Sequence, residues 1–256
     1  MLFRCARQFE RRYLHGEKER PGENIVVGSF FHETLDHNYR QKIQTHADLP
    51  QSEIIQYLHD AAVPKVLEDE GGEENIRWDT NLTKARGDAE RMTSAYTQMI
   101  VPRIQPVGTE FKFELDVERV PVPIIGYVDL WDEYRTIDTK TGKQAATKIK
   151  PSWRLQGGLY AWATGRPTEF HSISRAQQPR IVTALESDEL IVAPPSEAQG
   201  EHMAHIFRLA AATISFYYSQ FGTEGWPATG AVPDYTRNIL PCDFCGWRKG
   251  CPAWAT

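Results

Sequence analysis

Residues 108–142 read GTEFKFELDVERVPVPIIGYVDLWDEYRTIDTKTG, and this stretch decides the fold. Its first part, FKFELDVE (111–118), alternates apolar with charged side chains, which is the period of a half-buried strand. Residues 124–131 and 135–140 follow at hairpin spacing, and Gly142 lies at the end of the third segment. The pattern predicts a three-strand meander.

Apolar residues at helical spacing lie on both sides of this meander. The predicted segments are, in chain order, a helix over 29–44 with Ser29 as its N-cap, a helix that starts at Ser52 and is broken or kinked at Pro64, a helix over 82–100, a helix over 152–164 capped by Ser152, strands over 169–174 and 181–185, and a helix over 201–221. This order of elements predicts an α/β or α+β fold with a central mixed sheet.

The chain has 256 residues, of which 41% are apolar and 25% charged, and this composition is that of a globular protein. It excludes a disordered, collagen-like or coiled-coil chain. No segment approaches the ~18 consecutive apolar residues of a membrane span. The N-terminal residues also lack the apolar core of a signal peptide. We therefore expect a cytoplasmic protein without a membrane partner.

Charge is unevenly distributed along the chain. The formal net charge of −5 argues against a general nucleic-acid coat protein. Residues 135–154, however, carry six basic side chains against the single acid Asp138. Such a segment can line a basic groove for an anionic polymer, or it can be a solvated face. The charges alone leave both interpretations open.

The four cysteines are Cys5, Cys242, Cys245 and Cys251, and the last three form a C-x2-C-x5-C motif. All four can serve one four-ligand site for a soft metal centre. The candidates are a structural zinc ion and an iron–sulfur cluster, and the spacing alone favours zinc. Unrelated buried cysteines are the alternative.

A site that uses cysteines from both ends of the sequence predicts a single domain over residues 1–256. Its expected parts are an N-terminal helical part (1–100), a core of sheet and helix (105–192), and a C-terminal helix with the cysteine tail (198–256).

Two carboxylates and a lysine lie on the predicted meander. Asp138 and Lys140 share one face of a strand because they are two residues apart, and hairpin pairing can bring Asp129 beside them. Two carboxylates on one face repel each other unless a cation lies between them, and oxygen ligands of this kind suit Mg²⁺ or Mn²⁺. A neighbouring lysine can orient an attacking water. The alternative is a surface ladder of aspartate and lysine.

Three further side chains are candidates on predicted helices. His32 can be a metal ligand or an ordinary structural histidine. Gln156 and Tyr160 are four residues apart and therefore project from one helical face, where they can also make ordinary hydrogen bonds.

The motifs occur in the order G-x-x-x-H (28–32), G-x-x-D (126–129), D-x-K (138–140) and Q-x-x-x-Y (156–160), between Cys5 and the C-terminal cysteine motif. In this order the sequence resembles the RecB-like branch of the PD-(D/E)XK nucleases. Within that branch it is most similar to the iron–sulfur members, namely the CRISPR-associated RecB-like exonucleases and the nuclease domain of the AddB helicase–nuclease subunit. The likeness runs from Cys5 to Cys251. It departs from the family at Ala6, where proline usually follows the first cysteine.

The resemblance implies a restriction-endonuclease-like core, a central mixed β-sheet flanked by helices, with both chain ends joined at the cysteine cluster. It also implies residue roles. The metal ligands would be His32, Asp129, Asp138 and the backbone carbonyl of Thr139, with Glu110 as a weaker candidate. The catalytic set would be Asp129, Asp138, Lys140, Gln156 and Tyr160. The DNA-binding set would be Lys143, Lys148, Lys150 and Arg154. The ligands of a [4Fe–4S] cluster would be Cys5, Cys242, Cys245 and Cys251, with structural Zn²⁺ as the alternative.

The expected function is therefore that of a Mg²⁺- or Mn²⁺-dependent DNA exonuclease that acts on single strands or DNA ends. The alternatives are a DNA-end-binding scaffold subunit without turnover and a structure-specific endonuclease. Expected partners are DNA and a helicase or another nucleic-acid-processing protein. The resemblance leaves the pathway open between recombination, CRISPR adaptation and phage DNA processing.

Overall fold

The computed structural model describes residues 5–226. The chain forms two compact units. The larger unit comprises Pro21–Leu115 and Ile124–Gly200, and the smaller comprises Met1–Arg20, Asp116–Pro123 and Glu201–Thr256. The predicted single domain over 1–256 stays a prediction.

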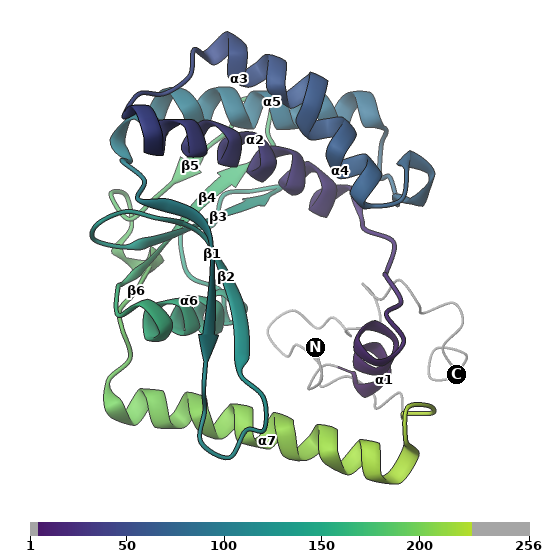
Figure 1. The fold of residues 1–256 in the computed structure, drawn as a ribbon. Helices are drawn as coiled ribbons and strands as arrows, with labels where there is room; N and C mark the ends of the chain where they lie inside the picture. Colours follow the sequence, from purple (N-terminus) through teal and green to yellow (C-terminus); the bar gives the residue numbers. More distant parts are fainter. Residues whose placement is uncertain (1–4, 227–256) are drawn as a thin grey trace. The chain divides into compact units, whose positions relative to one another are not determined.

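A mixed sheet forms the centre of the larger unit (Figure 1). Its strands are β1 (Gly108–Leu115), β2 (Ile124–Trp131), β3 (Thr136–Gly142), β4 (Thr168–Ser174), β5 (Ile181–Val182) and β6 (Ile191–Val192). β1, β2 and β3 pair antiparallel, as the meander predicts, whereas β3 and β4 pair in parallel. β5 and β6 both pair antiparallel with β4. The predicted mixed sheet is confirmed.

Helix α6 (Pro151–Thr164) supplies the crossover that parallel strands require. It packs closely on the sheet because Gly157 has no side chain. A Cβ atom at that position would lie 2.7 Å from the ring of Phe170 on β4. The helix ends at Gly165, whose left-handed conformation (φ 67°) lets its N–H reach the Ala161 carbonyl. The predicted helix stop is therefore correct.

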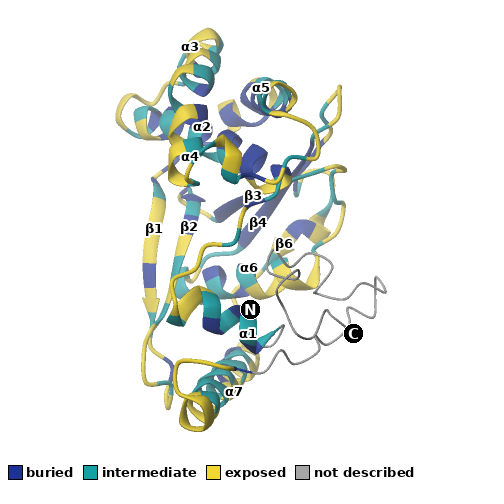
Figure 2. Cartoon of the chain, turned by 90° about the vertical axis from the view of Figure 1, so that its right-hand side faces the viewer, coloured by how far each residue is buried: buried dark blue, intermediate teal, exposed yellow. Residues whose placement is uncertain are grey.

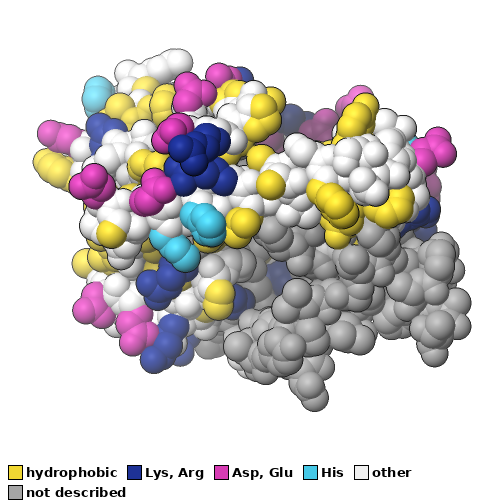
Figure 3. All heavy atoms as spheres, turned by 90° about the horizontal axis from the view of Figure 1, so that it is seen from below, with side chains coloured by type: hydrophobic (Ala, Val, Ile, Leu, Met, Phe, Trp, Pro, Cys, Tyr) yellow, Lys and Arg dark blue, Asp and Glu magenta, His cyan; other side chains and the backbone are white. Residues whose placement is uncertain are grey.

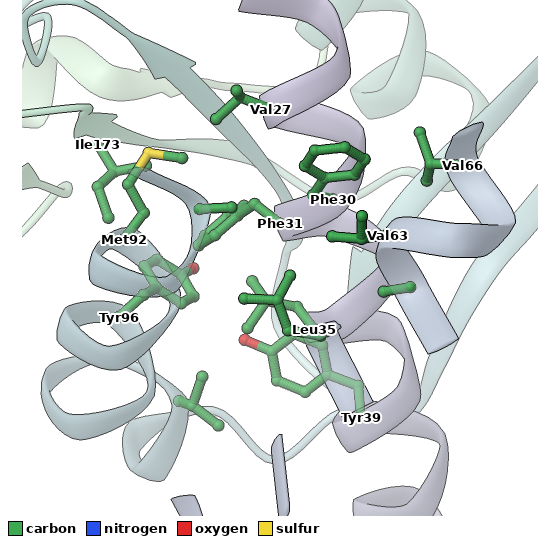
Figure 4. Packing of buried hydrophobic residues seen from close by; sticks show 14 of the residues in the cluster. Val27, Phe30, Phe31, Leu35, Tyr39, Val63, Val66, Met92, Tyr96 and Ile173 are labelled. Carbon is green, nitrogen blue, oxygen red and sulfur yellow. The ribbon is translucent and has the colours of Figure 1, made fainter. Parts of the chain in front are cut away.

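The opposite face of the sheet carries a helical layer. Its helices are α2 (Glu23–Thr45), α3 (Gln51–Tyr57), a π-helical turn (Leu58–Ala62), α4 (Val63–Asp69) and α5 (Leu82–Met99). Short 3₁₀ turns lie at Glu73–Asn75, Val101–Arg103 and Asp188–Leu190. The main core lies between α2, α4, α5 and the sheet, and Figure 4 shows Phe30, Phe31, Met92 and Tyr96 pointing toward one another there.

Helix α2 begins earlier than the sequence predicts. Ser29 is not an N-cap but lies within the helix, where its hydroxyl donates to the Ile25 carbonyl at 3.2 Å. The true start is stabilised by tertiary contacts. The buried Glu23 carboxylate accepts hydrogen bonds from the backbone N–H groups of Asp79 and Thr80.

Other boundaries also differ from the predictions. The segment predicted from Ser52 is divided into α3, the π-helical turn and α4, and Pro64 lies at the start of α4, next to the change from π-helix to α-helix. Helix α6 is capped at Lys150 and not at Ser152. β5 is shorter than the predicted strand over 181–185, and β6 was not predicted. Short edge strands such as these carry little sequence pattern of their own.

The smaller unit contains α1 (Ala6–Phe9), the π-helical turn Glu10–Leu14 and most of α7 (Glu197–Phe221). Glu10 is only 2% exposed. Its carboxylate accepts hydrogen bonds from the backbone N–H groups of Gly225 at 2.9 Å and Trp226 at 3.0 Å. The Trp226 ring stacks on Phe9, with the centroids 5.7 Å apart. Segments far apart in the sequence therefore pack together here.

Helix α7 starts one turn before its predicted position and exposes several apolar side chains, including Leu209, Phe216 and Tyr218. Figure 3 shows one face of the molecule, with apolar side chains at its surface. No helix within residues 5–226 is both long and apolar enough to cross a membrane.

Candidate active site

Asp138 and Lys140 of β3 form the centre of the site. Asp138 is 1% exposed, and the Lys140 ammonium lies 2.7 Å from its Oδ2 and donates to its Oδ1 at 3.0 Å. Among the described residues no group donates a hydrogen bond of good geometry to Oδ2. Burial raises the pKa of Asp138 to about 6, although Lys140 acts in the opposite direction. Asp138 therefore carries a buried charge that is incompletely compensated.

Asp129 of β2 lies next to Asp138 across the strand pair. The register pairs Leu130 with Ile137, which places the two aspartates one residue further along on a common face. Burial also raises the pKa of Asp129, against the effect of Lys140. Two carboxylates that have lost much of their contact with water thus share one site. A cation between them stabilises such an arrangement.

His32 approaches these carboxylates from α2. Its Nδ1 lies 3.8 Å from Oδ2 of Asp129. Burial lowers the pKa of His32 below its ordinary value, so the imidazole is neutral at pH 7 and keeps a lone pair for a metal. Gly28, one turn earlier, allows this approach, because a Cβ atom there would lie 2.9 Å from Oγ1 of Thr141 on β3.

Glu110 of β1 completes the group of acids. It has a positive φ of 51°, and its pKa is raised by burial and by the charges of Asp129 and Asp36. A small cavity of about 30 Å³ lies among these elements, large enough for one water molecule. Its lining includes His32, Asp36, Glu110, Asp129 and Thr139.

A line of hydrogen bonds connects the lysine to α6. Lys140 Nζ donates to Oε1 of Gln156 at 2.8 Å, and Nε2 of Gln156 donates to the Tyr160 hydroxyl at 2.7 Å. Burial raises the pKa of Tyr160, so this hydroxyl keeps its proton at neutral pH. The structure thus brings together His32, Glu110, Asp129, Asp138, Lys140, Gln156 and Tyr160.

The predicted DNA-binding residues lie outside this line of contacts. Lys143 is exposed in the loop after β3, and Arg154 is exposed in the first turns of α6. Lys148 pairs with Glu189 at 3.3 Å, and the Lys150 ammonium lies 4.8 Å above the ring centroid of Trp153. The role of this segment stays a prediction.

The predicted cysteine cluster can be located only in part. Cys5 is partly buried immediately before α1, whereas Cys242, Cys245 and Cys251 lie outside the described residues. The cluster therefore stays a prediction.

The donor groups of the site suit a divalent metal ion. Within residues 5–226, no three His, Cys, Asp or Glu side chains already stand in a metal-binding arrangement. Carboxylates repel one another in the absence of a cation, and Lys140 here pairs with Asp138. A neutral imidazole, two carboxylates and the buried Asp138 Oδ2 without a hydrogen bond nevertheless provide ligands that fit Mg²⁺ or Mn²⁺.

A buried polar network behind β3 was not predicted. The Tyr96 hydroxyl on α5 shares hydrogen bonds with Thr139 Oγ1 and His171 Nδ1, and Nε2 of His171 contacts Glu169 at 2.9 Å. Burial raises the pKa of Glu169, but the hydrogen bond from His171 and the Arg135 guanidinium outweigh it and leave that pKa below its usual range. The available signal was the alternation of Glu169 and His171 along a predicted strand.

A protein-family profile identifies the superfamily of this chain. The sequence profile of the PD-(D/E)XK nuclease superfamily matches residues 2–252. A solved protein of Eubacterium rectale named "Putative exonuclease" is similar with a TM-score of 0.45 and 11% identity, over 89% of this chain and 90% of that chain. The solved protein SSO0001 is similar with a TM-score of 0.42 and 16% identity, over 98% of this chain and 95% of that chain. No curated protein matches the sequence. Because the profile covers nearly all of its length, this chain belongs to the PD-(D/E)XK nuclease superfamily.

Proposed function

We propose that this nuclease is a Mg²⁺- or Mn²⁺-dependent DNA exonuclease that acts on single strands or DNA ends. The observation that carries the proposal is the contact line from Asp138 through Lys140 to Gln156 and Tyr160. It holds an ammonium group beside two carboxylates, whose mutual repulsion a bound metal ion would reduce. A purely structural ion pair would not need the second, partly buried carboxylate of Asp129 beside it.

The proposed metal ligands are His32, Asp129, Asp138 and the backbone carbonyl of Thr139, with Glu110 as a weaker candidate. When bound there, the ion would polarise the scissile phosphate and lower the pKa of a bound water. His32 suits this role because its neutral form presents a lone pair. Asp138 suits it because ligation would compensate its buried charge.

Lys140 is the proposed catalytic lysine. Asp138 Oδ1 and Gln156 Oε1 accept two of its three N–H bonds, so the direction of the third is restricted. This N–H can orient the attacking water or donate to a phosphoryl oxygen as negative charge develops. Tyr160 in turn fixes the amide of Gln156. Gln156 and Tyr160 therefore act by positioning the ammonium group.

The remaining proposals concern substrate and cofactor. Lys143, Lys148, Lys150 and Arg154 would contact phosphates of the DNA strand. Cys5, Cys242, Cys245 and Cys251 would bind a structural [4Fe–4S] cluster, with Zn²⁺ as the alternative. We propose a cytoplasmic enzyme that works with a helicase or another DNA-processing protein.

The test is digestion of end-labelled single-stranded and double-stranded DNA, and of a single-stranded circle, with Mg²⁺, Mn²⁺ or EDTA. We expect metal-dependent degradation of linear DNA, an intact circle, and no cleavage by the Asp129→Asn variant. Cleavage in EDTA, or by Asp129→Asn at the wild-type rate, would refute the metal site. A cut circle would indicate an endonuclease. Binding of DNA ends without any turnover would indicate a scaffold subunit.

A further inference from the structure

The hairpin of β1 and β2 exposes apolar side chains that the fold does not use. Tyr127 and Ile125 of β2 are each 52% exposed. Figure 2 shows β1 exposed over much of its length and β2 largely of intermediate exposure, whereas most of β3 and all of β4 are buried. An aromatic ring that remains half in water on a sheet is available to a ligand.

This exposed face is continuous with the candidate active site. Along β2 the side chains of Ile125 and Tyr127 are exposed, those of Val128 and Leu130 are buried, and Asp129 is partly buried. Because side chains alternate along a strand, Asp129 falls on the same side as Tyr127. Tyr127 therefore lies two residues, or about 6.8 Å, before a proposed metal ligand on the same surface. A strand of nucleic acid with its scissile phosphate at Asp129 would meet Tyr127 next.

A basic side chain, that of Lys112, lies beside Tyr127. The strand register places Lys112 of β1 directly opposite Tyr127, and Lys112 is about half exposed. Its ammonium lies 2.5 Å from Glu114 Oε1, so one charge on this face is already balanced. An aromatic ring with a cross-strand lysine is a combination suited to base stacking with a nearby phosphate contact.

The other side of the active site has the opposite character. An open cleft of about 550 Å³ extends from His32 and Glu110 between α2 and α4. Its acidic lining residues are Glu33, Asp36, Asp69, Glu70 and Glu110. Its two basic residues pair with two of these acids, Arg40 with Asp36 at 2.5 Å and Lys65 with Glu33 at 2.7 Å, so the acids outnumber the bases by five to two. This cleft repels a phosphodiester backbone.

We propose that the β1–β2 face is the platform for the substrate strand, with Tyr127 stacking on an unpaired base and Lys112 contacting a phosphate. The occupant is single-stranded DNA, because only unstacked bases present a ring face to a side chain. This inference rests on the proposed nuclease function and adds to it the path of the strand.

The test measures binding of fluorescent oligo(dT) and of an abasic oligonucleotide of equal length, in EDTA so that cleavage is absent. Tyr127→Ala should weaken binding of oligo(dT) by about 5- to 100-fold, the range measured for loss of one base–aromatic stack. It should leave binding of the abasic strand unchanged, because that strand offers no base. Tyr127→Phe keeps the ring and should retain wild-type affinity, which also controls for folding.

Tyr134 provides a matched control, since it is a 74% exposed tyrosine in the turn between β2 and β3. Tyr134→Ala should bind both oligonucleotides normally. Unchanged binding of oligo(dT) by Tyr127→Ala would overturn the proposal, and so would an equal loss on both strands. These outcomes are independent of the proposed function, whose failure would appear as absent cleavage by a wild-type protein that binds normally.

Discussion

Replacing Asp138 by asparagine is expected to stabilise the metal-free protein and to abolish its response to divalent metal. Burial raises the pKa of this carboxyl from 3.8 to about 6. The folded protein therefore binds the proton more tightly than the unfolded chain, so the free energy of unfolding falls as the pH rises from about 4 to about 6. Above that pH range the buried negative charge lowers the free energy of unfolding by its full amount. Asparagine is neutral and therefore removes this loss.

The size of the effect follows from the shift. About two pKa units correspond to ~3 kcal/mol at ~1.4 kcal/mol per unit. For a chain of this size, 1 kcal/mol raises the melting temperature by roughly 2–4 °C. We therefore expect Asp138→Asn to melt several degrees above the wild type at pH 7 without metal. At a Mn²⁺ concentration of about 100 times the dissociation constant, the wild type should gain ~2.7 kcal/mol. The variant should gain none.

The assay is thermal and urea unfolding, followed by circular dichroism, with and without Mn²⁺ at pH 7. Asp132→Asn is the matched control, because Asp132 is equally a buried aspartate but accepts hydrogen bonds from Tyr134, Arg135 and the Arg135 side chain. It should destabilise the protein and leave the response to Mn²⁺ intact. A metal-free Asp138→Asn protein that is less stable than the wild type would refute the electrostatic reasoning.

Three other predictions follow from the site and the sequence. Lys140→Ala should lower kcat by about 10²–10³-fold, the effect of losing one positioned donor, while calorimetry shows Mn²⁺ binding retained; wild-type turnover would contradict its catalytic role. Joint neutralisation of Lys148, Lys150 and Arg154 should weaken DNA binding and reduce its dependence on salt concentration, because each lost phosphate contact releases about one counterion fewer. If fluorescence anisotropy shows the same dependence of the binding constant on salt as in the wild type, the DNA does not run along this segment. Protein purified without oxygen should be brown with about four irons per chain, and Cys5→Ser should lose iron and melt at a lower temperature; a colourless protein with one zinc would rule out the cluster.

Local sequence patterns were sufficient to predict the strands that carry the acidic side chains of the site. Period-two alternation put Asp138 and Lys140 on one face, and hairpin spacing put Asp129 beside them. Both depend on neighbours within a few residues. The start of α2 could not be predicted in this way, because the groups that bind Glu23 are Asp79 and Thr80, more than 50 residues away.

The buried network behind β3 could not be predicted from the sequence for a similar reason. Glu169 and His171 lie on one strand, but Tyr96, which contacts His171, comes from helix α5, and Arg135, which contacts Glu169, comes from the turn before β3. Parallel pairing of β3 with β4 brings these groups together, and it places Thr139 directly beside His171. The sequence around His171 does not indicate that Tyr96, 75 residues earlier, will contact it.

The missing side chain of Gly28 sets a dimension of the active site. A methyl group there would lie 2.9 Å from Thr141 Oγ1, closer than carbon and oxygen normally approach, so the threonine would have to rotate or α2 would have to withdraw from β3. Withdrawal would carry His32, one turn along the same helix, away from the aspartates. Positions 28 and 141 therefore act together as a spacer that determines how far apart nitrogen and oxygen ligands stand. An engineer who wished to fit a larger cation would begin with this pair, because neither residue carries a charge.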